Sequence, residues 1–424
     1  MKVDYIEETS VRKALAFEIE PEVVDGEIAL RAKDYAKKAK IPGFRPGKIP
    51  SEVIKKRFLP QILEDAAEAI VNRVVWEELE GRGLRPLANP KVTELKIDAN
   101  QPMTFRAVFE TLPLVQVPEY KGLSAKVKGP HVSDDKLVEE LDRLRDEAAR
   151  YDPVEGRAAA DRDFVVLDVV YRTAGGESKQ DENVLVEIGS ADNHADLNAA
   201  LAGMSPGETK DVQLVYPADH PSEKLAGQTV DYTVSVKAIK TKVVPALDDE
   251  FAKDLGEFDS LDALRQRIRR QLEAQEDRRV DRDVKEALIQ ALVEQATFEV
   301  PDTLVERHMN ARTEGLAREL AMSGVDPQQA NIDWKQFREA QREGATKAAK
   351  ADILLDEIAR REKLDASPAD VDGEVARYAE RLSRPVEQVR AQMEKEGGLT
   401  ALRARIREDK TLDLLKADAR LDFE

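Results

Sequence analysis

Apolar side chains that recur every three or four positions dominate the chain from residue 245 to its end. The pattern is clearest at Leu261, Leu264, Ile268 and Leu272, followed after the polar stretch EAQEDRR by Val280, Val284, Leu288 and Leu292. This spacing gathers side chains on one face of an α-helix. Helices should begin and end at Ser260, Pro301, Gly324, Ser367-Pro368, Pro385 and Gly397-Gly398. Residues 243–424 are therefore predicted to form an all-α domain of helical arms or a bundle.

Residues 154–242 follow a different pattern. FVVLDVVY, NVLVEI, DVQLVY and TVDYTVSVKAI are separated by glycine turns, and the last alternates apolar with polar residues. Alternation with a period of two predicts strands, so this region should be a small, mostly β domain. Residues 1–113 mix strand and helix patterns, and residues 114–153 read as a linker followed by a helix that Ser133 caps. The predicted fold class is multidomain α+β.

Composition excludes several functions. The chain has no cysteine, so disulfides and thiolate chemistry are ruled out. The four histidines, His131, His194, His220 and His308, lie far apart, and no nucleophile–base pair stands out. We expect no metal and no cofactor. No apolar run has the length of a membrane span and no secretory signal is visible, so a cytoplasmic location is expected.

Charge is distributed unevenly. The chain carries −18, but residues 31–60 hold ten lysines or arginines against two acids, which gives +8. A basic segment on an acidic body suggests one anionic docking partner rather than general affinity for nucleic acid.

This basic segment contains IPGFRPGKIP, residues 41–50. One interpretation is a connector between helices, with Phe44 packed on the core. The other is a recognition tip stiffened by prolines, with Phe44 as an apolar anchor and Arg45 as a planar donor for a carboxylate or phosphate. Lys48, Lys55, Lys56 and Arg57 would add a longer-range field.

The pattern Gly43-Phe44-Arg45-x-Gly47-x-x-Pro50 resembles the signature of the trigger factor family, the ribosome-bound chaperones of bacteria. GMSPGE (203–208) and PALDDEFAKDLGEFDSLDALRQRI (245–268) extend the similarity over most of the chain. The resemblance implies docking of Gly43, Phe44, Arg45, Gly47, Lys48 and Pro50, with support from Lys55, Lys56 and Arg57. The implied partner is the large ribosomal subunit at the exit tunnel, a ribosomal protein with adjacent rRNA.

The same resemblance implies ATP-independent binding of nascent and unfolded polypeptides by the C-terminal helices, partly on the ribosome and without a membrane. It leaves open a homodimer off the ribosome. The C-terminal residues that contact clients are not identified individually.

In this family the middle domain resembles FKBP-type peptidyl-prolyl isomerases, whose pocket is walled by aromatic rings. The corresponding positions here are Val169, Leu197, Tyr216, His220 and Tyr232. Because several aromatic rings are replaced, isomerase activity is expected to be weak or absent.

Two alternatives to the chaperone remain open. The first is a free-standing prolyl isomerase enzyme, against which the missing aromatic rings argue. The second is an RNA-binding protein that uses the basic segment, which the acidic remainder of the chain disfavours.

Overall fold

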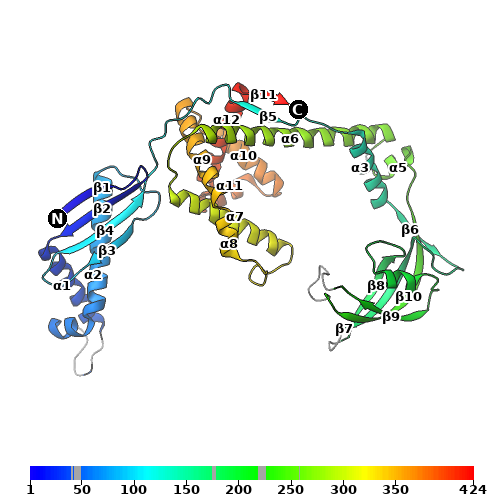
Figure 1. Ribbon diagram of the computed structural model, residues 1–424, viewed down its shortest axis with the longest axis horizontal. Coiled ribbons are helices and arrows are strands. Elements are labelled where there is room, and N and C mark those ends of the chain that lie inside the picture. Colours follow the sequence, from blue (N-terminus) through cyan, green and yellow to red (C-terminus); the bar gives the residue numbers. More distant parts are fainter. Residues whose placement is uncertain (40–41, 43–48, 174–177, 218–225, 257) are drawn as a thin grey trace. The chain divides into compact units, whose positions relative to one another are not determined.

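The computed structural model describes residues 1–39, 42, 49–173, 178–217, 226–256 and 258–424 (Figure 1). It divides into two compact units, Met1–Lys128 with Asp281–Glu424, and Gly129–Val280. Each unit is described by itself. The domain boundaries expected at residues 113, 153 and 242 stay predictions.

The N-terminal region is an antiparallel sheet covered by two helices. Its elements are β1 (Lys2–Glu7), β2 (Arg12–Ile19), α1 (Pro21–Lys38), α2 (Ser51–Gly81), β3 (Lys91–Lys96) and β4 (Met103–Glu110), and the strand order is β1-β2-β4-β3. Along β4, buried and half-buried side chains alternate strictly. The buried face packs with residues of α1 and α2 in one apolar cluster, which includes Phe17 and Phe105.

Helix α2 is two helical pieces joined at a kink. Phe58 has non-helical angles (φ −122°, ψ 21°), and Pro60 follows two residues later. Proline disfavours helical geometry before it and removes a backbone donor, which accounts for the break. The first piece therefore carries Lys55, Lys56 and Arg57 on a short helix of its own.

The middle region is an antiparallel sheet around one long strand. Its elements are β6 (Arg150–Val154), β7 (Asp163–Thr173), β8 (Lys179–Glu187), α4 (Ala195–Leu201), β9 (Thr209–Val215) and β10 (Thr229–Val243). One edge of β10 pairs with β7, and the other pairs first with β9 and then with β6. The four predicted strands are confirmed as β7 to β10.

Strand β6 is a difference from the sequence prediction. The helix that Ser133 caps, α3 (Asp134–Glu147), was expected to run to about residue 152. It ends earlier, because residues 150–154 complete the edge of β10 beyond the end of β9. Local sequence does not contain this long-range pairing.

Helix α6 (Leu261–Gln295) runs without interruption through the polar stretch that separates its two apolar patterns. Leu264 and Ile268 pack with α3 and with Phe251 of α5 (Asp249–Asp254). The boundary between the compact units falls within α6, after Val280. The polar stretch thus marks a change of packing partner, not a helix end.

The rest of the chain is helical, as predicted, apart from its last strand. The elements are α7 (Asp302–Met322), α8 (Trp334–Ala340), α9 (Arg342–Glu362), α10 (Pro368–Arg381), α11 (Val386–Lys395), α12 (Gly398–Asp418) and β11 (Arg420–Phe423). The predicted starts after Pro301, Ser367 and Pro385 are confirmed, and Ser367 forms a capping box with Asp370. β11 pairs in parallel with β5 (Ser124–Val127), an unpredicted pairing across nearly the whole chain.

Candidate functional site

The proposed docking tip lies largely outside the described residues. This applies to Gly43, Phe44, Arg45, Gly47 and Lys48. Of the signature, Pro50 is described: it occupies the N-cap position of α2, with φ −59° and ψ 138°. The structure therefore describes only the flanks of the loop, and both the connector and the recognition tip stay predictions.

The flanks of the loop are anchored to the domain core. Ile49 and Ile54 are buried, and Ala39 packs on the same apolar cluster. The rings of Tyr35 on α1 and Phe58 on α2 lie 5.7 Å apart. In Figure 1, the last turn of α1 and the first turn of α2 meet at one end of the domain. The loop therefore begins and ends on a rigid base.

The same end of the domain is lined with exposed cations. They are Lys33, Lys37 and Lys38 on α1, and Lys55, Lys56 and Arg57 on α2. Of these, Lys37 contacts Asp34 at 3.1 Å, and this hydrogen bond lowers the pKa of Asp34. Lysines at the last turn of α1 also interact favourably with the helix dipole. The base of the loop can thus attract an anionic surface through cations on both α1 and α2.

The described prolyl-pocket positions come together on one apolar cluster of the middle sheet. Val169 on β7, Leu197 on α4 and Tyr232 on β10 all pack against it, and each is partly buried. The hydroxyls of Tyr216 and Tyr232 share a hydrogen bond of 2.9 Å. Burial, followed by this bond, raises the pKa of Tyr232. His220 lies outside the described residues.

Sequence reasoning missed Tyr171 as a member of this group. Tyr171 lies directly opposite Tyr232 in the ladder of β7 and β10, and their rings stack at 5.7 Å. Both line a cavity of about 470 Å³ with Arg172, Asp211 and Asp231. A two-residue step from Val169 along β7 would have pointed to Tyr171. Stacked rings beside a cavity can hold an apolar ring by contact, without proton transfer.

Exposed apolar side chains mark the helical region. Met322 is 89% exposed at the end of α7, and Val325 follows it in the next turn. Leu382, the C-cap of α10, and Val386, the first residue of α11, are also exposed. Leu112 and Leu114 are exposed beside a cavity of about 560 Å³ that also contacts α7, α9 and α12. The sequence could not single these out, because helical spacing does not reveal which apolar positions remain uncovered.

Among the described residues, no group of three or more acidic or histidine side chains is placed to hold a metal ion. No helix in the described part of the chain combines the length and apolarity needed to cross a membrane.

Two family models match the sequence. One, described as the bacterial trigger factor protein, covers residues 1–144, and the other, described as its C-terminus, covers residues 260–417. A trigger factor of Solibacter usitatus (strain Ellin6076) is 36% identical over 393 residues, 92% of this chain and 93% of the relative. The chain belongs to the trigger factor family.

Other trigger factors agree over similar lengths. The one from Koribacter versatilis (strain Ellin345) is 35% identical over 408 residues, 95% of this chain and 93% of the relative. The one from Anaeromyxobacter sp. (strain Fw109-5) is 34% identical over 427 residues, 99% of each chain.

The predicted multidomain α+β fold of a trigger factor is confirmed by a solved structure. That structure, described as "Promiscuous Substrate Recognition in Folding and Assembly Activities of the Trigger Factor Chaperone", matches with a TM-score of 0.54 and 21% identity. The match covers 98% of this chain and 99% of that chain.

Membership of the trigger factor family confirms the first predicted function. The chain is a ribosome-associated chaperone that binds nascent polypeptides, and a free-standing prolyl isomerase is not favoured.

Proposed function

We propose that residues 43–50 dock this trigger-factor-family chain on the large ribosomal subunit beside the tunnel exit. The cationic, core-anchored base of the loop is the observation that supports this most directly. Phe44 inserts beside a ribosomal protein and Arg45 pairs with a carboxylate on it. Lys55, Lys56 and Arg57 face adjacent rRNA, where exposed cations attract phosphates. The protein works in the cytoplasm, partly ribosome-bound and without a cofactor.

Co-sedimentation with ribosomes tests the docking assignment. The Phe44→Ala/Arg45→Ala variant should stop pelleting with ribosomes while its circular dichroism stays unchanged. Arg73→Ala/Trp76→Ala is a matched control, since it removes an exposed arginine and an exposed aromatic ring from α2 of the same domain. Equal pelleting of the docking variant and the wild type would exclude this docking site.

Salt dependence separates the rRNA contact from the protein contact. Replacing Lys55, Lys56 and Arg57 with glutamine should make the plot of log affinity for ribosomes against log salt concentration less steep. The slope should fall by about one for each phosphate contact that is lost. An unchanged slope would remove rRNA from the proposal and leave the ribosomal protein.

For clients, the best-supported contacts are the exposed apolar side chains Met322, Val325, Leu382 and Val386. They are flanked by charged residues, which suits weak binding of many different unfolded chains. Replacing all four with serine should reduce suppression of aggregation of an unfolded protein and leave ribosome pelleting intact. A homodimer off the ribosome is tested by sedimentation equilibrium.

Residues 154–242 form an FKBP-like domain whose isomerase activity is weak or absent. Leu197 packs on the core, at the position where the family resemblance implies an aromatic floor. A protease-coupled assay on an X-Pro peptide measures this. Turnover equal to that of an FKBP with an aromatic pocket would refute the assignment.

A further inference from the structure

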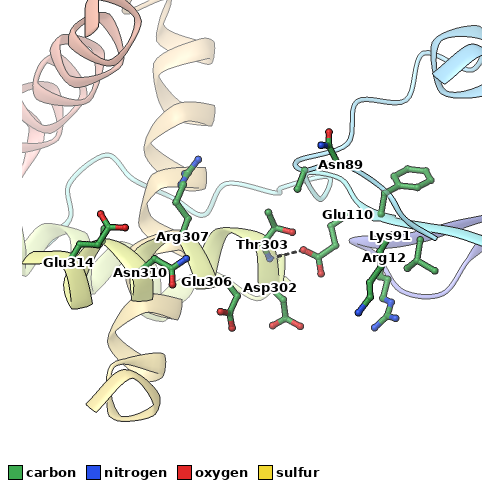
Figure 2. A pocket seen from close by; sticks show the side chains of 14 residues that line it. Arg12, Asn89, Lys91, Glu110, Asp302, Thr303, Glu306, Arg307, Asn310 and Glu314 are labelled. Carbon is green, nitrogen blue, oxygen red and sulfur yellow. Dashed lines mark hydrogen bonds between the residues drawn. The ribbon is translucent and has the colours of Figure 1, made fainter. Parts of the chain in front are cut away.

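Helix α7 begins without a capping side chain of its own. Its N-cap residue is Pro301, which has no side-chain acceptor. The N–H of Thr303, at the second helical position, instead donates to Oε2 of Glu110 at 2.7 Å (Figure 2). Glu110 is the last residue of β4, 193 positions earlier in the chain. A carboxylate at a helix N-terminus satisfies a free donor and meets the positive end of the dipole.

A second carboxylate makes the reciprocal contact. Glu299 lies just before α7, and its Oε2 accepts from the hydroxyl of Ser10 at 2.8 Å, in the turn between β1 and β2. Hydrogen bonds from the side chains of Ser10 and Thr9, and from the backbone of Ser10 and Val11, lower the pKa of Glu299. Each side of the contact thus supplies one carboxylate to donors of the other.

The backbone around Glu110 is held on the N-terminal side. Its carbonyl accepts from the N–H of Leu87 at 2.8 Å, and the next residue, Thr111, donates to the carbonyl of Val11 at 2.9 Å. Leu87 itself packs against the cluster formed by Leu304 and Val305 on α7. Glu110 therefore joins a fixed strand end to a fixed helix start.

A cavity of about 890 Å³ separates the two sides, with Arg12 and Lys91 on the N-terminal wall and Asp302, Glu306 and Glu314 on α7 (Figure 2). Several of these charges pair on their own side: Arg12 with Glu8, and Glu306 with Arg338 and Arg342. The bonds from Thr303 to Glu110 and from Ser10 to Glu299, together with the packing of Leu87 on α7, join the two walls directly.

We propose that Glu110 and Glu299 are positioning residues that hold the N-terminal domain at a set orientation on α7. Docking fixes only the N-terminal domain, so the client-binding helices are oriented over the tunnel exit only if this joint holds. That consequence rests on the proposed docking function, but the joint itself does not.

The absence of cysteine allows a direct measurement of the joint. Spin labels on Ala99→Cys and Ala321→Cys, both at exposed alanines, report the distance between the N-terminal sheet and the end of α7 by pulsed electron paramagnetic resonance. The parent protein should give one narrow distribution. In Glu110→Ala/Glu299→Ala the population outside that peak should rise about tenfold, the effect of losing a hydrogen bond to a charged group.

Two further variants separate positioning from general stability. Glu110→Gln/Glu299→Gln keeps an oxygen acceptor, so its distribution should lie between those of the parent and the alanine variant. Glu314→Ala, on the cavity wall, should match the parent. The proposal is overturned if both double variants match the parent, or if Glu314→Ala broadens the distribution equally. Retained ribosome pelleting by the alanine variant would show separately that docking survives the loss of the joint.

Discussion

The N-terminal sheet and the middle sheet each place two aromatic rings directly opposite one another on neighbouring strands. Phe17 and Phe105 stack at 4.6 Å with an interplanar angle of 9°, and they are 3% and 2% exposed. Tyr171 and Tyr232 stack at 5.7 Å and 25°, but both are only partly buried and line a cavity. The same cross-strand geometry thus occurs in a core and at a candidate binding surface.

The covering helices account for the difference. The N-terminal pair lies in the cluster to which α1 and α2, of 18 and 31 residues, contribute. In the middle sheet, α4 has only seven residues. The two accessible rings, Tyr171 and Tyr232, are those of tyrosines and therefore carry hydroxyls. The hydroxyl of Tyr232 shares a hydrogen bond with the hydroxyl of Tyr216. An aromatic pair in a strand pattern therefore predicts packing, and whether it also forms a site depends on what covers it.

The largest expected effect tests this comparison directly. Phe105→Ala should lower the free energy of opening of the N-terminal sheet by about 4 kcal/mol, because it removes a fully buried ring and leaves a cavity. Tyr171→Ala should cost the middle sheet about half as much, since its ring is partly solvated already. Native-state hydrogen exchange in the full chain reads each sheet separately. Equal costs would mean that the two pairs are packed alike.

The sequence predicted the parts of the fold that have a clear period. β4 and β10 alternate and the two apolar patterns of α6 have helical spacing, so these elements were found, whereas the bounds of α8 and α9 were not. β6 and β11 were missed because both are short and pair with residues distant in the chain. A strand that is mostly exposed carries no apolar alternation, so its pairing depends on tertiary structure.

The candidate site was predictable only where a motif exists. The docking signature is readable because its glycines, prolines, Phe44 and Arg45 have fixed spacing. The spacing of two between Val169 and Tyr171 places both on one face of β7, but the stacking of Tyr171 on Tyr232 depends on strand register, which neither segment contains alone. Glu110 and Glu299 carry no local signal at all, since their partners lie far along the chain.

Each sheet also contains one buried charged side chain, Lys13 in the N-terminal sheet and Asp163 in the middle sheet, and their surroundings differ. Lys13 in the N-terminal sheet contacts Glu7 and the carbonyl of Thr9, whereas Asp163 in the middle sheet contacts Arg157, Thr241 and the N–H of Ala160. Arg157 first, then the other hydrogen bonds, lower the pKa of Asp163 to about 2.

Arg157→Ala should therefore destabilise the middle sheet at neutral pH, and by less than Tyr171→Ala, because solvent screens the ion pair of the half-exposed arginine. Since the folded pKa of Asp163 lies below its unfolded value of about 3.9, its stabilisation is present above that pH and is lost as the pH falls towards 2. Hydrogen exchange of β7 at pH 7 and near pH 3 measures both effects. Arg12→Ala, at an exposed arginine of the N-terminal sheet, is the matched control. If Arg12→Ala reduced the protection of β7 as much as Arg157→Ala does, the Asp163 network would have no specific role.

The smallest effect concerns the hydroxyl of Tyr232, which distinguishes the accessible aromatic pair from the phenylalanine pair. Tyr232→Phe should cost about 1 kcal/mol at pH 8, where it removes one hydrogen bond and leaves the ring stack in place. Burial raises the folded pKa of Tyr232 above its unfolded value of about 10, so its stabilisation is complete below that pH and is lost as the pH rises above it. Urea unfolding followed by circular dichroism at pH 8 and pH 11 should show a smaller loss of stability at alkaline pH for Tyr232→Phe than for the parent.

Tyr216→Phe is the control, because it keeps the buried hydroxyl of Tyr232. It should retain most of the alkaline loss of stability, since burial is the larger cause of the raised pKa of Tyr232. If Tyr232→Phe and the parent lose stability equally, the hydroxyl is solvated in the folded chain, and the tyrosine pair differs from the phenylalanine pair only in its cover.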